Sequence, residues 1–99
     1  MFNPGYYITA ELKVKVPENI DKARQHLKEL CEETLKEPGC SIFTLHQCVD
    51  DKRRFLLWER FNSEDDFKFH FEQPHTQEYL RQDLTEVVQY FVTDVPVPI

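Results

Sequence analysis

Residues 55–80 read FLLWERFNSEDDFKFHFEQPHTQEYL and predict a strand, a capped turn and a helix that carries two histidines. Because strand side chains alternate, Glu59 shares its face of the strand with apolar residues such as Leu57. Ser63 is a candidate N-cap, and the three acidic residues after it place negative charge at a helix N-terminus. His70 can then face inward, so this stretch gathers most of the groups suited to proton transfer.

Two of these groups have both a catalytic and a structural interpretation. His70 suits a general base, because a neutral imidazole can take up and return a proton near physiological pH. The alternative is a helix histidine that bonds a carboxylate. Glu59 is costly on an apolar strand face unless it is paired. It either pairs with His70 and orients the ring, or it forms a cross-strand pair with Lys13 or Lys15.

The remaining elements follow from periodicity and from helix and turn signals. Residues 6–16 alternate as a strand, Asn19 can cap a helix that Pro38-Gly39 stops, and residues 41–49 and 54–61 predict two strands joined by a hairpin turn. Thr76 can cap a further helix that carries Leu84, Val87 and Val88, and residues 89–95 predict the last strand. The order β-α-β-β-α-β predicts an α+β, ferredoxin-like fold in which both helices cover one face of a four-stranded antiparallel sheet.

Composition limits the class of protein. Ninety-nine residues predict a single domain, 1–99, and a core of that size gains from an extra interface, so we expect a homodimer. Twelve basic against 18 acidic residues give a formal charge of −6 with no basic stripe, which argues against nucleic acid as a partner.

Redox state and compartment follow from the cysteines and the apolar segments. Cys31, Cys40 and Cys48 are odd in number and match neither a CxxC pair nor a zinc ribbon, so reduced, buried thiols are expected. No apolar stretch approaches the roughly 20 residues that span a bilayer, and no secretory leader is evident. We expect no membrane partner and a cytoplasmic location.

The stretch around His70 resembles the antibiotic biosynthesis monooxygenase (ABM) family. Its members share a strand that ends in Glu and an aromatic residue, a short polar cap, and a helix of the form H-x-x-x-x-H. The likeness extends over 1–99 through the helix that ends in Pro38-Gly39-Cys40 and the strand that follows it. The matching residues are Glu59, Phe61, Ser63, His70, Pro74 and His75.

The resemblance implies a dimeric α+β barrel, in which the bare sheet faces of two chains pack together and residues 95–99 lie as an arm across the partner. It also implies a cofactor-independent monooxygenase that acts with dioxygen on a quinol-like or polycyclic phenolic substrate. The substrate anion itself reduces dioxygen, so the protein need only bind a flat ring and remove a proton. His70 would be the base and Glu59 its orienting partner.

Further residues are candidates for the same pocket. Trp58, Phe67 and Phe71 could form its walls, although aromatics at this spacing are also typical of a plain core. His75 follows a helix break, where it is either catalytic or merely contacts solvent. Tyr7 could bind a substrate oxygen and His46 could line the pocket, but both also suit a subunit interface.

No cofactor is predicted. With two glycines, the chain has no phosphate-binding loop, and a spacing of five across Pro74 argues against His70 and His75 converging on a metal. The haem-degrading branch of the family is disfavoured because the first strand lacks an asparagine. Two alternatives stay open: an isomerase of a small phosphorylated signal molecule, with Arg53, Arg54 or Arg60 as phosphate anchor, and a non-catalytic dimeric module that binds a small ligand.

Overall fold

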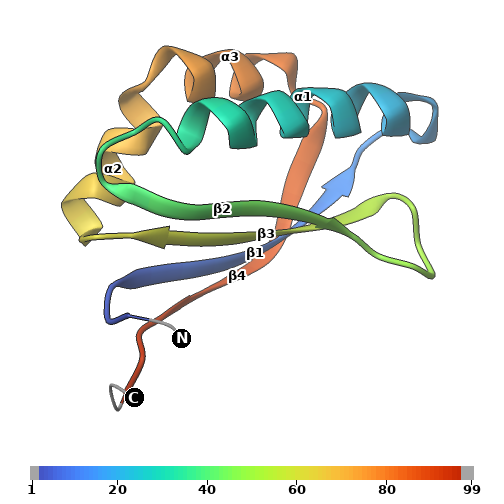
Figure 1. Cartoon of the computed structure of the whole chain (residues 1–99). Helices are drawn as coiled ribbons and strands as arrows, with labels where there is room; N and C mark the ends of the chain where they lie inside the picture. Colours follow the sequence, from blue (N-terminus) through green and yellow to red (C-terminus); the bar gives the residue numbers. More distant parts are fainter. Residues whose placement is uncertain (1–2, 97–99) are drawn as a thin grey trace.

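The computed structural model describes residues 3–96 as two layers (Figure 1). One layer is a four-stranded antiparallel sheet in the order β2-β3-β1-β4, and the other holds the helices, all on one sheet face. This confirms the predicted ferredoxin-like α+β fold. The elements are β1 (Tyr6–Val14), η1 (Pro17–Asn19), α1 (Ile20–Thr34), β2 (Cys40–Gln47), β3 (Arg54–Phe61), α2 (Glu64–Glu72), α3 (Pro74–Gln82) and β4 (Thr85–Thr93).

Strand register decides which residues face the helices. Ile8 of β1 pairs with Glu59 of β3, which in turn pairs with Phe43 of β2. All three side chains are buried beneath the helical layer, so the carboxyl group of Glu59 lies among core residues. The alternation predicted for the first strand is confirmed from Ile8 to Val14, but β1 ends there and Val16 is 46% exposed.

The junction between α2 and α3 departs from the prediction. Pro74 does not merely interrupt a helix, because it occupies the first turn of α3, where its missing N–H costs nothing. The N-cap of α3 is therefore Gln73, and Thr76 lies inside the helix with its side chain buried. The N-cap of α2 is as predicted, since Ser63 Oγ accepts the backbone N–H of Asp66.

The last strand begins earlier than predicted. Asp83 adopts a left-handed conformation with φ of 53° and ends α3. The β-branched run that follows then pairs with β1, so Val87 and Val88 belong to β4 and not to a helix. Periodicity alone did not show this, because apolar residues at 84, 87 and 88 also fit a helical face.

A tight loop joins α1 to β2 and brings residues 35–39 against α2. Gly39 is buried, and a Cβ atom there would overlap the side chain of Asp66. The carbonyl group of Gly39 accepts the backbone N–H of Asn62, just before α2 begins. The loop is therefore held at a fixed distance from α2, and Glu37 lies within it.

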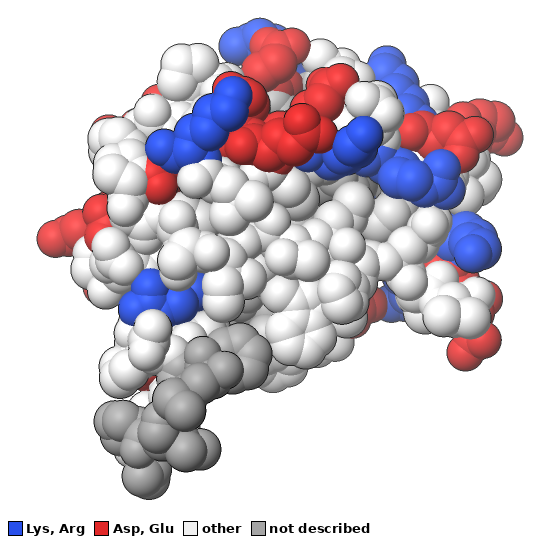
Figure 2. All heavy atoms as spheres, in the orientation of Figure 1, with Lys and Arg blue, Asp and Glu red and all other residues white. Residues whose placement is uncertain are grey.

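The second sheet face is not covered by any described element (Figure 1). In Figure 2 the charged side chains gather over the helical layer, while the region below is largely uncharged. Within residues 3–96 no helix has the length and hydropathy needed to cross a membrane. Cys31, Cys40 and Cys48 are free thiols, of which Cys40 alone is fully buried. The predicted C-terminal arm falls largely on residues 97–99, which lie outside the described part of the chain.

Candidate functional site

A cavity of about 470 Å³ lies between the sheet and the helices α2 and α3. Its walls are mostly apolar, as is common for sites that bind organic ligands. The few polar groups on it include Glu59 on the sheet side, and His70 and Thr76 on the helix side. Phe67 and Phe71 of α2 also line this cavity.

His70 is held in the cavity wall by a buried carboxylate. Its Nδ1 atom lies 2.8 Å from Oε2 of Glu37, and both side chains are 4% exposed. An ionised carboxylate only accepts hydrogen bonds, so the Nδ1 atom carries the proton. The second ring nitrogen, Nε2, has no hydrogen-bond partner among residues 3–96 and is left with its lone pair on a residue that lines the cavity.

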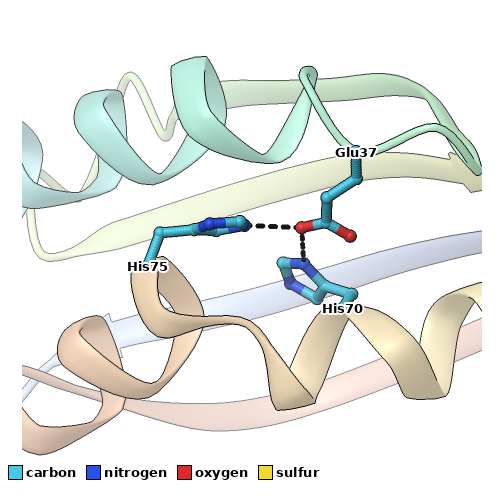
Figure 3. A group of neighbouring side chains, drawn as sticks. All are labelled: Glu37, His70 and His75. Atoms are coloured by element: carbon cyan, nitrogen blue, oxygen red, sulfur yellow. Dashed lines mark hydrogen bonds and ion pairs between the residues drawn. The ribbon is translucent and has the colours of Figure 1, made fainter.

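His75 converges on the same carboxylate. Its Nε2 atom lies 2.6 Å from Glu37 Oε2, so one oxygen atom joins two imidazole rings from α2 and α3 (Figure 3). The expectation that a spacing of five across Pro74 would keep His70 and His75 apart is therefore wrong. Because α3 begins at Pro74 with an extended residue before it, the chain changes direction and the two ring centroids lie 6.1 Å apart.

Burial sets the protonation state of His70. Desolvation lowers the pKa of the imidazole, and the hydrogen bond that His70 donates to Glu37 opposes this only in part. The ring is therefore neutral near physiological pH. A neutral ring with its Nδ1–H fixed by a carboxylate and its Nε2 free is the form that a general base requires.

Glu59 does not orient His70. The two residues line one cavity, but Glu59 forms no hydrogen bond or ion pair within residues 3–96, and Lys15 pairs instead with Asp83. Burial raises the pKa of Glu59 to about 8, and the negative charge of Glu37 adds to the increase. At neutral pH this carboxyl group is mostly protonated and can donate a hydrogen bond into the cavity.

Comparison with known proteins identifies the relatives of this chain. The antibiotic biosynthesis monooxygenase family matches residues 5–82. The uncharacterized protein YjcS of Bacillus subtilis (strain 168) is 38% identical over 82 residues, which are 83% of this chain and 78% of that protein. The chain belongs to the antibiotic biosynthesis monooxygenase family.

Solved structures agree with this assignment. The structure of YjcS has a TM-score of 0.84 at 36% identity and covers 91% of this chain and 97% of its own. A Bacteroides thetaiotaomicron protein described as a possible oxidoreductase has a TM-score of 0.82 at 22% identity, covering 95% and 100%. A crystal structure of an antibiotic biosynthesis monooxygenase has a TM-score of 0.79 at 21% identity, covering 95% and 99%. The latter two support the fold alone.

The residues predicted for the site of this ABM chain divide between the two sheet faces. Phe67 and Phe71 lie on the cavity with His70, but Trp58 and Tyr7 line a second hollow, which borders the first at Ile8 and Glu59. The ring of His46 lies 5.8 Å from that of Trp58, so His46 belongs to the same outer face. The prediction that Trp58 forms one wall with Phe67 and Phe71 is wrong, because odd and even positions of β3 face opposite ways.

Two residues of the site were missed from the sequence. Glu37 belongs to no motif in the sequence, and the sequence indicates only a capping role for Thr76. Thr76 Oγ1 lies 3.2 Å from His70 Nδ1 and closes the cluster from α3. One signal in the sequence is that Glu37 directly precedes Pro38-Gly39, which ends a helix. A side chain just beyond a helix end can point in a direction that helical periodicity does not predict.

Proposed function

We propose that this ABM chain is a cofactor-independent monooxygenase that acts on a quinol-like or polycyclic phenolic substrate. The observation that carries the proposal is the state of His70: neutral, fixed at Nδ1 by Glu37, and free at Nε2 in the wall of an apolar cavity. The family assignment is consistent with oxygenase chemistry. The cavity offers space and apolar walls for a flat ring.

The chemistry needs only a base and a dry pocket. His70 Nε2 takes the proton of a substrate hydroxyl, and the resulting anion supplies electrons to dioxygen. One oxygen atom is added to the ring and the other leaves as water, while the quinol is oxidised to a hydroxyquinone, so the substrate provides all the electrons. Glu37 keeps the imidazolium in place and stabilises its charge, the role of the carboxylate in a catalytic triad.

Glu59 has a different role from the one predicted. A protonated carboxyl group on the wall opposite α2 can donate a hydrogen bond to the second substrate oxygen, which becomes a carbonyl acceptor as the ring is oxidised. Phe67 and Phe71 provide apolar surface beside His70. These contacts would hold the ring between a base and a donor.

The test is oxygen uptake with menadiol as the probe substrate. The wild-type protein should consume oxygen above the chemical background, and His70→Ala should lower turnover by roughly 10²-fold or more, the usual effect of losing a general base. Glu37→Gln should also be slower, because the amide can present a donor to Nδ1 and favour the wrong tautomer. His26→Ala, on α1 and outside the cavity wall, is the matched control and should keep full turnover.

Two results would contradict this proposal. Menadiol oxidation that never exceeds the chemical background, together with menadione binding, would indicate a ligand-binding module and not an oxygenase. Turnover that persists in His70→Ala while the melting temperature falls would make His70 structural. The phosphate-binding isomerase gains no support, since no Lys or Arg is among the described residues that line the cavity.

A further inference from the structure

We propose that Glu37, His70 and His75 form a binding site for a divalent first-row transition-metal cation, with Zn²⁺ as the type ion. The three side chains come from the loop after α1, from α2 and from α3, and their ligand atoms all lie within 4.8 Å of one another (Figure 3). The convergence of three separate segments on one point is the structural observation from which the proposal starts.

The donor set fits such an ion. Two imidazole nitrogens and one carboxylate oxygen are typical zinc ligands, and imidazole favours Zn²⁺, Cu²⁺ and Ni²⁺ over Mg²⁺ or Ca²⁺. The set leaves one tetrahedral position for water. A hard cation would need several more oxygen ligands than the described residues offer here.

The geometry needs only a small adjustment. Oε2 of Glu37 lies 2.8 Å from His70 Nδ1 and 2.6 Å from His75 Nε2. Metal bonds of about 2.0–2.1 Å in tetrahedral geometry place ligand atoms roughly 3.3 Å apart. The cluster would therefore open by about half an ångström to replace the shared protons with a cation. His75 can supply this movement, because its side chain is 20% exposed and lies in the first turn of α3.

An unsatisfied atom provides independent support. Oε1 of Glu37 is buried and has no hydrogen-bond partner among the described residues, although the other oxygen of the same carboxylate is contacted twice. A buried carboxylate with one unpartnered oxygen is costly. A bound cation would offset that cost, because it attracts the charge of the whole group and not of one oxygen.

The position of the cluster separates the cation from the cavity chemistry. His70 lines the cavity, but Glu37 and His75 are not part of its wall, so the cation would lie behind the His70 ring and not where substrate and dioxygen meet. A cation on Nδ1 moves the remaining imidazole proton to Nε2. His70 then has no free lone pair to act as a base, so Zn²⁺ would inhibit the oxygenase reaction; this consequence rests on the proposed function. The binding of Zn²⁺ itself does not depend on that function.

The experiment uses the full chain after treatment with a chelator. Titration with Co²⁺ should give visible absorption bands that saturate at one ion per chain and that Zn²⁺ abolishes by competition. Zn²⁺ should also raise the melting temperature, as any ligand of the native state does. His75→Gln, at a partly exposed position that tolerates the change, should weaken binding by about 10-fold or more, and Glu37→Gln should do the same.

His26→Gln serves as the matched control, because His26 lies on α1 outside this three-residue cluster and the change should leave affinity unchanged. The proposal is overturned if Co²⁺ and Zn²⁺ show no saturable binding, or if affinity is unaltered in His75→Gln and Glu37→Gln. Because binding is measured without quinol, its failure is distinct from a failure of oxygen uptake. If Zn²⁺ inhibits oxygen uptake by the wild type but not by His75→Gln, the cation site and the proposed activity are linked through His70.

Discussion

The carboxyl group of Glu59 gives the protein a pH-dependent term in its stability. Its pKa is raised from an ordinary 4.5 to about 8, chiefly by burial and then by the charge of Glu37. At pH values between 4.5 and about 8, the Glu59 carboxyl group is ionised in the unfolded chain but still protonated in the folded chain. This contribution is therefore fully present below pH 4.5 and is lost as the pH rises towards 8.

Glu59→Gln should remove that dependence. Within the window from pH 4.5 to 8, each pH unit lowers the free energy of unfolding of the wild type by up to about 1.4 kcal/mol through this group, and the neutral amide has no such loss. Urea unfolding at several pH values measures the difference between the two proteins. Glu18→Gln, at an exposed position, should follow the wild type. Parallel curves for wild type and Glu59→Gln would show that Glu59 is ionised in the folded state.

At the residue scale, the sequence predicted the positions of side chains better than their partners. The alternation of β3 correctly put Glu59 on the buried face, whereas its predicted pairing with His70 was wrong. The partner of His70 could not be found this way, because Glu37 is separated from it by 33 residues and reaches it through a loop. Pairings of this kind depend on how elements pack, which no local pattern encodes.

Among the elements, the loop that carries Glu37 leaves no room for a side chain at Gly39. Gly39→Ala should destabilise the protein by about 1–3 kcal/mol, because the new methyl group overlaps the side chain of Asp66 near its Cβ atom and cannot be relieved by rotating the carboxylate alone. The loop would shift away from α2 and take Glu37 with it. Thermal or urea unfolding measures the loss.

Gly5→Ala is the matched control for this change. The three atoms nearest to a Cβ atom at Gly5 would all belong to the guanidinium end of the flexible Arg60 side chain, which can move aside. A smaller loss of stability is expected there than in Gly39→Ala. Equal losses in the two variants would mean that the contact between Gly39 and Asp66 does not hold the loop in place.

Element boundaries show where sequence patterns carry enough information. The N-cap at Ser63 and the strand 54–61 were predicted correctly, because a capping side chain and a period of two are local signals. The end of α3 was not, since apolar residues 84, 87 and 88 satisfy a helical period as well as a strand. The left-handed conformation of Asp83 ends the helix, so the residues after it form a strand. Such a conformation is hard to predict from the sequence at a residue other than glycine.

At the scale of the whole molecule, one sheet face and one sheet edge have no cover among the described elements. Strand β4 is an edge strand with exposed apolar side chains on both of its faces; the exposed fractions are 59% for Val87, 61% for Tyr90 and 56% for Phe91. Exposed apolar edge strands promote association with other chains. Tyr90 and Val87 also line the cavity, so a partner placed over β4 would help to close it.

We therefore expect a homodimer in which the bare sheet faces pack together. Phe91 pairs with Thr9 on the face away from the helices, so Phe91→Glu would put a charge into that interface and should convert the dimer to a monomer. Light scattering at micromolar concentration should give twice the mass of one chain for the wild type and the mass of one chain for Phe91→Glu. Leu35→Glu, which replaces an exposed apolar residue of the helical layer, should stay dimeric. A wild-type protein with the mass of one chain would rule out the barrel and leave the apolar face of β4 without an explanation.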